Sequence, residues 1–160
     1  MQKDIAIDYL KNYPETIPTL AKYSYDEWRP VYDHAGLSYK DVIRSYEERI
    51  NINKLPIALV AVHSGQVIGT GALKIQDLYI RPKYSPWLGG MYVVENFRGK
   101  GIGTLLIEHL LEEATKLKLK CLYLWTPFSE SLYARHGWQP IERVDYCCYK
   151  ISIMYREIDS

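Results

Sequence analysis

The residues with the clearest chemical potential are three glycines that precede a leucine-rich run. Within "FRGKGIGTLL", Gly99, Gly101 and Gly103 alternate with other residues and lie beside the cationic Arg98 and Lys100. Glycine lets the backbone approach an anion that a Cβ would block, and amides at a helix N-terminus bind phosphate groups. The stretch therefore predicts a binding loop for a phosphate-bearing ligand.

Two common nucleotide-binding loops do not fit this spacing. The Walker loop requires G-x-x-x-x-G-K-[ST], but Gly101 follows the Gly-Lys pair and Val94 occupies the place of the first glycine. The dinucleotide fingerprint G-x-G-x-x-G would need its third glycine at Thr104 or at Leu106. The remaining pattern is R-G-x-G-I-G at the start of a helix, and a tight turn without any ligand is the alternative.

Composition restricts the class of protein. With 160 residues, 48% hydrophobic and 24% charged, the chain is expected to be one soluble domain over residues 1–160. A formal net charge of +1 provides no basic field for nucleic acid, so no nucleic-acid partner is expected. The N-terminal residues are not expected to form a signal peptide, and the sequence contains no apolar run of about 18 to 20 residues. We therefore expect a cytoplasmic protein that does not bind membranes.

The three cysteines are expected to be packing residues. Cys121, Cys147 and Cys148 lack metal-ligand spacing, so no metal is expected. If Cys147 and Cys148 lie in a strand, their side chains point to opposite faces, which suits packing better than a redox pair. Unpaired thiols also suit the reducing cytoplasm.

The elements that must position the glycine loop mix strands and helices. Hydrophobic periodicity and turn residues predict strands at 4–10, 56–65, 66–75, 87–94 and 121–126, two closing strands within 138–158, and helices at 15–32, 38–50, 103–117 and 129–137. The first helix is expected to end near Pro30, and Ser38 to cap the second. Gly89 and Gly90 interrupt a strand and signal a bulge. This order predicts a mixed α/β sheet.

Together with its flanks, the glycine loop resembles the coenzyme A loop of the GNAT superfamily of N-acetyltransferases, [RQ]-x-x-G-x-[GA]. Residues 98–103 fill that pattern, "SESLYARHGWQPIER" is similar to the family's Tyr and Gly-aromatic segment, and "HSGQVIGTGAL" to its central hairpin. The resemblance covers residues 56–157; the first fifty-odd residues match only as two helices that border the acceptor site. It implies an α/β (α+β) fold with a mixed, mostly antiparallel sheet that splays between its fourth and fifth strands.

The resemblance also implies acetyl-CoA as the acetyl donor and coenzyme A as the product. The residues implied to hold its pyrophosphate are Arg98, Gly99, Lys100, Gly101, Ile102, Gly103 and Thr104. Those implied to flank its pantetheine arm are Met91, Tyr92 and Val93. Many relatives have an Asn seven residues before the motif tyrosine, where this chain has Thr126, whose hydroxyl replaces only part of the amide's hydrogen bonding.

Two residues are implied to act on the reacting groups. Tyr133 matches the family's general acid, and a phenol with a pKa near ~10 suits protonation of a departing thiolate. The Val93 amide would stabilise the negative charge that develops on the thioester oxygen. We expect a primary amine to attack directly within a ternary complex, and Cys121, in a buried strand, to be a poor nucleophile.

The acceptor amine must be neutral to attack, so a base or a water chain is required. The candidate bases are Asp26, Glu27, Asp33, His34 and Asp77, and no motif distinguishes among them. Trp28, Tyr84 and Trp87 are expected to line the acceptor groove, and Glu27, Trp28, Asp77 and Trp87 are our substrate-binding candidates.

The acceptor itself, a small-molecule or peptide amine, is left open by the sequence. A catalytically silent coenzyme A-binding sensor or interaction module of the same fold is the alternative function, and a nucleotide-binding regulator is a third. A homodimer formed through a terminal strand is also an alternative to a monomer.

Overall fold

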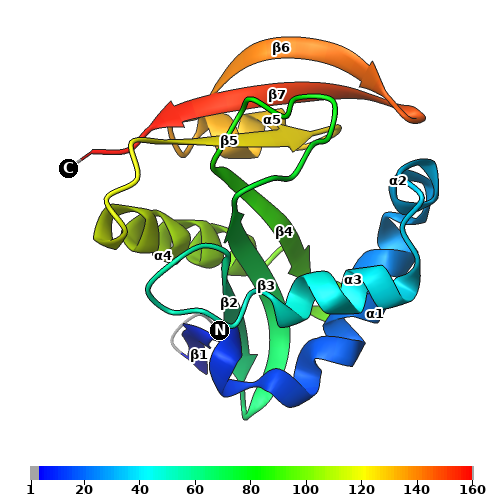
Figure 1. The fold of residues 1–160 in the computed structure, drawn as a ribbon. Coiled ribbons are helices and arrows are strands. Elements are labelled where there is room, and N and C mark those ends of the chain that lie inside the picture. Colours follow the sequence, from blue (N-terminus) through cyan, green and yellow to red (C-terminus); the bar gives the residue numbers. More distant parts are fainter. Residues whose placement is uncertain (1–3, 160) are drawn as a thin grey trace.

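The computed structural model describes residues 4–159. Within them, seven strands form one sheet in the order β1-β2-β3-β4-β5-β7-β6, and Figure 1 shows β5, β6 and β7 diverging from the rest. The strands are β1 (Ile5–Tyr9), β2 (Ile57–His63), β3 (Gln66–Lys74), β4 (Trp87–Val93), β5 (Cys121–Thr126), β6 (Gln139–Tyr146) and β7 (Tyr149–Glu157). Neighbouring strands are antiparallel except for the parallel β4–β5 pair. The predicted mixed, mostly antiparallel sheet is confirmed.

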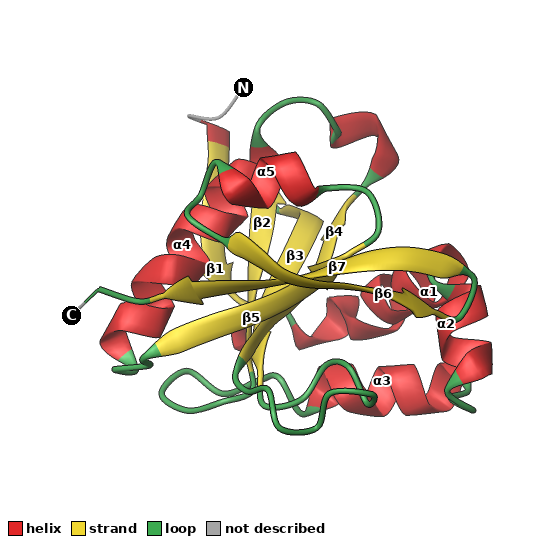
Figure 2. Ribbon diagram, turned by 90° about the horizontal axis from the view of Figure 1, so that it is seen from above, coloured by secondary structure: helices red, strands yellow, loops and turns green. Residues whose placement is uncertain are grey.

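Helices cover both faces of this sheet, as Figure 2 shows from above. They are α1 (Ile17–Glu27), α2 (Arg29–His34), α3 (Tyr39–Glu47), α4 (Ile102–Lys116) and α5 (Glu130–Ala134), with 3-10 turns at Leu10–Asn12, Pro14–Thr16 and Glu95–Phe97. Leu59 and Val60 of β2 belong to opposite cores because side chains alternate along a strand. Leu59 packs in the core of α4, and Val60 in the core of α1 and α3. No described helix is long and apolar enough to cross a bilayer.

The first predicted helix is in fact two. Trp28 has non-helical angles (φ −108°, ψ 25°), so α1 ends before it and α2 begins at Arg29. Pro30 therefore lies in the first turn of α2, and the prediction that it ends a helix is wrong. Proline is tolerated there because the first amides of a helix need no internal acceptor.

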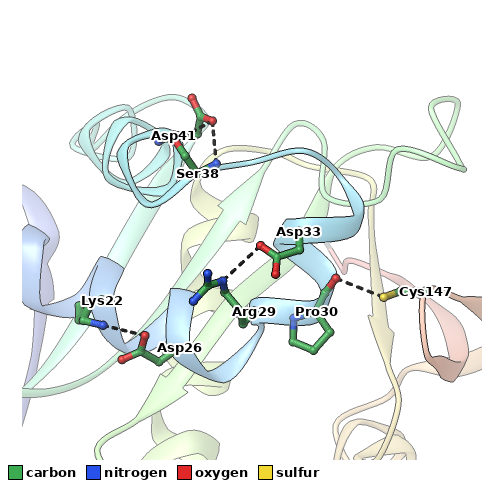
Figure 3. Close-up of polar contacts among 8 residues, drawn as sticks. All are labelled: Lys22, Asp26, Arg29, Pro30, Asp33, Ser38, Asp41 and Cys147. Carbon is green, nitrogen blue, oxygen red and sulfur yellow. Dashed lines mark hydrogen bonds and ion pairs between the residues drawn. The ribbon is translucent and has the colours of Figure 1, made fainter.

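The predicted cap of α3 is confirmed. Asp41 N–H donates to Ser38 Oγ at 3.3 Å, and Ser38 N–H donates to Asp41 Oδ2 at 2.9 Å, which completes a capping box (Figure 3). The hydrogen bonds from the Ser38 backbone and side chain hold the pKa of Asp41 below its usual value. This cap fixes the start of α3, and Arg49 follows the end of that helix.

The sheet opens between β4 and β5. The two strands pair at one position, Trp87 with Tyr123, and diverge beyond it. On its other edge, β4 pairs with β3, and the register slips between Thr70 and Ala72. Since Thr70 pairs with Tyr92 and Ala72 with Gly89, β4 contains an extra residue there, which confirms the bulge predicted from its two glycines.

The adjacent cysteines lie in the turn between β6 and β7, outside any strand, and the expectation that they are packing residues is wrong for both. Cys147 has φ 58°, both side chains are exposed, and the two sulfur atoms are 3.8 Å apart. The Cys147 thiol donates to the carbonyl of Pro30 at 3.2 Å, which links this turn to α2 (Figure 3). Cys121 begins β5, and partial burial raises the pKa of its thiol.

Candidate active site

The glycine loop connects β4 to the first turn of α4. Gly99 and Gly101 have φ +75° and +84°, in the left-handed region that favours glycine, and Gly101 is the N-cap of α4. A Cβ built at Gly99 or at Gly103 would meet no heavy atom of the described residues within 4 Å. Open space therefore borders a helix N-terminus, where backbone amides and the helix dipole favour an anion. This arrangement can accept a phosphate group.

A cavity of about 860 Å³ fills the opening between β4 and β5 and extends toward α1, α2 and α3. The predicted site residues that line it are Glu27, Trp28, Asp77, Met91, Tyr92, Val93, Arg98, Gly103, Thr126 and Tyr133. The remaining members of the predicted phosphate loop lie around the start of α4: Gly99, Lys100, Gly101, Ile102 and Thr104. The side chain of Ile102 is in the core, so only its backbone is available to a ligand.

Val93 directs its backbone toward this opening. In an antiparallel pair, residues alternate between bonding their partner strand and facing the other edge. Because Val94 N–H donates to Ile68 O at 2.8 Å, the preceding Val93 faces the β5 side. There its carbonyl accepts a hydrogen bond from Arg98 Nε at 2.7 Å. The Val93 amide is thus placed on the wall of the cavity.

Arg98 connects the loop to both walls. Its Nη2 lies 3.1 Å from Glu27 Oε1 of α1, and its guanidinium carbon lies 5.1 Å from the centre of the Tyr92 ring. Tyr92 is in turn stacked on Tyr23 of α1, with ring centres 5.2 Å apart. In this structure Arg98 therefore joins β4, the loop and α1.

Tyr133 lies on the opposite wall, in α5. It is 9% exposed, and its ring meets Trp138 edge-on at 6.0 Å. Burial, assisted by the negative charge of Asp77, raises the pKa of Tyr133 to about 12. The phenol is therefore protonated at neutral pH and can donate its proton.

Thr126 holds the turn that leads into α5. Its Oγ1 accepts hydrogen bonds from the amides of Ser129 at 3.0 Å and Phe128 at 3.4 Å. The hydroxyl oxygen of Thr126 thus holds the turn that leads to α5, the helix that contains Tyr133.

Comparison with known proteins agrees with this geometry. The sequence model of the acetyltransferase (GNAT) family matches residues 17–138, which is most of the chain. The chain belongs to the GNAT family. It is accordingly an N-acetyltransferase that uses acetyl-CoA as donor. No curated protein sequence matches it.

Solved structures share the GNAT fold over nearly the whole chain. A putative acetyltransferase (yncA) from Salmonella typhimurium, solved with its cofactor acetyl-CoA, is 16% identical with a TM-score of 0.72, covering 98% of this chain and 95% of its own. A ribosomal-protein-alanine N-acetyltransferase from Brucella melitensis is 20% identical with a TM-score of 0.73. The match covers 95% of this chain and 99% of the Brucella chain. An aminoglycoside 6'-acetyltransferase type Ii is 20% identical with a TM-score of 0.70. The match covers 97% of this chain and 98% of the aminoglycoside acetyltransferase. At these identities the likeness concerns the fold.

On the acceptor side of this GNAT enzyme, three of the five candidate bases lie outside the cavity. Asp26 is ion-paired with Lys22 at 2.8 Å and Asp33 with Arg29 at 3.2 Å, all with well exposed side chains (Figure 3). The third candidate, His34, packs against aromatic rings, with its ring centre 6.2 Å from that of Tyr79 and 5.8 Å from that of Tyr146.

The two candidate bases that line the cavity, Glu27 and Asp77, are both ion-paired. Asp77 Oδ1 accepts from Lys74 Nζ at 2.6 Å, and both side chains are largely buried. Burial lowers the pKa of Lys74, while the charge of Asp77 opposes that change. A Cβ at Gly89 would lie 2.6 Å from Asp77 Oδ2, so this glycine makes room for the carboxylate against β4.

Two aromatic residues predicted to line the groove are elsewhere. Trp87 is fully buried, and its Nε1 donates to the carbonyl of Tyr84 at 2.7 Å. It occupies the position where β4 and β5 are still paired, whereas the cavity opens further along β4. Tyr84 stacks on Tyr123 with ring centres 4.5 Å apart and donates its hydroxyl to Glu142.

Trp28 does line the cavity, with partners that the sequence did not indicate. Its ring meets Trp125 of β5 at 5.6 Å and Tyr149 of β7 at 5.9 Å, both edge-on. Sequence reasoning also missed the charged wall residues Arg49 and Lys74. The only local signal was the Gly-Gly pair of β4. It indicated that some group comes close to the strand backbone, but it did not identify Arg49 or Lys74 as that group.

Proposed function

We propose that this GNAT enzyme transfers the acetyl group of acetyl-CoA to a primary amine by direct attack within a ternary complex. The observation that carries the proposal is one cavity with the Val93 backbone on one wall and buried, protonated Tyr133 on the other. A ternary complex needs both substrates in one space, and this cavity reaches from Gly103 of α4 to Trp28 between α1 and α2.

The open glycine loop would hold the diphosphate. The amides from Gly99 to Gly103 supply hydrogen bonds, and Arg98 and Lys100 supply positive charge. Met91 and Val93 would flank the pantetheine arm along the unpaired edge of β4. When bound, acetyl-CoA supplies an activated acetyl group, and the other steps depend on residues of this chain.

The amine nitrogen attacks the thioester carbonyl carbon while the Val93 N–H donates to the carbonyl oxygen. As the carbon–sulfur bond breaks, Tyr133 gives its phenolic proton to the sulfur. The excess proton on the new amide nitrogen passes to Glu27 or Asp77, directly or through water, and the phenolate regains a proton from solvent. The products are an N-acetylated amine and free coenzyme A.

Release of free thiol from acetyl-CoA with a panel of primary amines tests the proposal. We expect Tyr133→Phe to lower kcat about 10²- to 10⁴-fold, the usual range for loss of a general acid, with unchanged acetyl-CoA affinity. Tyr13→Phe, outside the cavity, is the matched control. Unchanged turnover in Tyr133→Phe would remove this residue from the mechanism. Binding of acetyl-CoA without thiol release to any amine would favour the silent coenzyme A-binding module.

A further inference from the structure

Arg49 is a buried cation on the acceptor side of β4. It follows α3, is 3% exposed and lines the cavity. Its backbone is fixed at both ends, since its N–H donates to Tyr46 O at 3.0 Å and its carbonyl accepts from Ala58 N–H at 3.1 Å. The side chain thus extends from a rigid base toward β4.

The guanidinium is only partly satisfied. Nη2 donates to Ser45 Oγ at 3.1 Å, and the guanidinium carbon lies 4.1 Å from the centre of the Tyr46 ring. Within residues 4–159, Nε and Nη1 have no hydrogen-bond partner. Buried polar groups in folded proteins are usually paired, so these donors need an explanation.

Nη1 lies against the bulge in β4. A Cβ at Gly90 would come within 2.8 Å of this nitrogen, and Gly90 has φ +62°. The bulge and the missing side chain together bring a guanidinium up to the strand that is expected to bind the thioester. The arrangement places Arg49 close to the proposed reaction site.

Other charges of the cavity wall are matched within the described chain. Lys74 pairs with Asp77 at 2.6 Å, and Arg98 pairs with Glu27 at 3.1 Å. Asp41 already accepts from Ser38 and lies 3.2 Å from Arg44. Arg49 is left as the cavity cation without a carboxylate partner among residues 4–159. The wall therefore carries one unmatched positive charge.

We propose that Arg49 binds a carboxylate of the acceptor, so that the substrate is an amine that also carries a carboxylate. The inference rests on the proposed acetyl transfer. A guanidinium is suited to this ligand, because its planar N–H groups form strong, charge-assisted hydrogen bonds to carboxylate oxygens. Polyamines and aminoglycosides, which are cationic throughout, would meet repulsion from the unpaired charge of Arg49.

The dimensions suit one small molecule. Gly90 and Val93 are three residues apart in β4, which is at most about 10 Å at a strand rise of about 3.3 Å per residue. An amine that reacts beside Val93 and a carboxylate bound to Arg49 can therefore belong to one amino acid. The same chemistry is offered by an acidic side chain near a peptide N-terminus, and the experiment separates these sources.

The test measures thiol release from acetyl-CoA with paired acceptors. One arm compares 3-aminopropanoate with propylamine and extends the amino acid series from glycine to 6-aminohexanoate. A second arm compares peptides beginning with Asp or Glu with the corresponding Asn or Gln peptides. We expect a carboxylate to raise kcat/KM at least tenfold, and the arm with the larger ratio identifies the source.

Arg49→Gln is expected to raise KM for the carboxylate acceptor about 100-fold, while KM for the matched neutral amine and the acetyl-CoA Kd stay within about twofold. Arg29→Gln is the control, because this exposed arginine of α2 pairs with Asp33 outside the cavity, and it should leave all three unchanged. If Arg49→Gln does not fold, Ser45→Ala removes the anchor of Nη2 and should raise the same KM selectively, by about fivefold.

Equal use of paired acceptors overturns the inference, as does an Arg49→Gln variant that loses activity equally with all amines, which would indicate a structural role. Thiol release from neutral or cationic amines alone also overturns it and leaves acetyl transfer intact. No thiol release with any amine would overturn the proposed function and this inference together.

Discussion

Two groups of glycines lie within fifteen residues of one another, and the structure uses them in opposite ways. In β4, the space that side chains of Gly89 and Gly90 would occupy is filled by the protein itself. Asp77 Oδ2 would be 2.6 Å from a Cβ at Gly89, and Arg49 Nη1 would be 2.8 Å from a Cβ at Gly90. These glycines admit a carboxylate and a guanidinium to the strand.

In the loop before α4, the equivalent space is open. A Cβ at Gly99 or Gly103 would meet no described atom within 4 Å. A glycine whose missing side chain is replaced by protein atoms positions those atoms, whereas one that faces open space beside a helix N-terminus leaves room for a ligand. In the proposed mechanism, Gly89 and Gly90 therefore belong to the side that binds the acceptor amine, and the loop to the side that binds acetyl-CoA.

Among the glycine variants, the largest expected effect comes from filling the open space with a charge. In Gly103→Glu, the new carboxylate faces the proposed diphosphate, and like charges in contact cost several kcal/mol. We expect the acetyl-CoA Kd to rise about 100-fold or more. Thermal stability should be retained, because Glu suits the first turn of a helix. Calorimetric titration and thermal melting measure the two effects.

Gly103→Gln is the matched control for charge, since its side chain has the same size. A Kd for Gly103→Gln that rises only about tenfold would support the assignment of this space to the diphosphate. If Gly103→Glu and Gly103→Gln bind acetyl-CoA equally well, the open loop does not hold the phosphates.

A smaller effect is expected from overfilling the occupied space. Gly89→Ala forces a methyl group against the Asp77 carboxylate, and such overpacking costs about 1 to 3 kcal/mol. We expect kcat/KM for the acceptor to fall about tenfold while acetyl-CoA affinity is kept, as measured by thiol release and titration. The same change at Gly103, where a Cβ meets no protein atom but enters the space assigned to the diphosphate, should weaken acetyl-CoA binding and leave acceptor kcat/KM at saturating acetyl-CoA unchanged. Equal behaviour of the two alanine variants would contradict the distinction.

The smallest expected effect is on the alkaline side of the pH profile. A pKa of about 12 means that Tyr133 keeps its proton as pH rises, so the acid form is present throughout the range from about 6.5 to 10. The neutral fraction of the acceptor amine grows over the same range. Acceptor kcat/KM should therefore rise and then level off. A falling limb with a midpoint near 8 or 9 that is absent in Tyr133→Phe would contradict the raised pKa of Tyr133.

The elements around the glycine loop could be predicted from sequence because their determinants are local. Residues 98–103 contain the loop pattern, the leucine periodicity gives α4, and Ser38 with Asp41 gives the cap of α3. Such signals depend on neighbours within a few positions, and the corresponding elements were confirmed. The exception is Pro30. Proline is common both in the first turn of a helix and just after the end of a helix, so this residue alone did not show which boundary it marks.

The acceptor side could not be predicted in the same way. Arg49 follows a helix with no motif around it, and only packing of α3 on the sheet brings it to Gly90. Trp87 illustrates the converse: its sequence position beside the groove strand suggested a wall residue, but it lies where β4 and β5 still pair and is buried. Which residues fill a gap left by glycine is a property of tertiary packing.

The central claim is that acetyl-CoA bridges the open loop and the Val93 amide, with the acceptor entering from the side of Arg49. A crystal structure with bound acetyl-CoA tests it most directly. We predict the diphosphate within hydrogen-bonding distance of the amides of residues 99–103, and the thioester oxygen within that distance of Val93 N. A diphosphate bound away from this loop, or a thioester remote from Val93, would contradict the account.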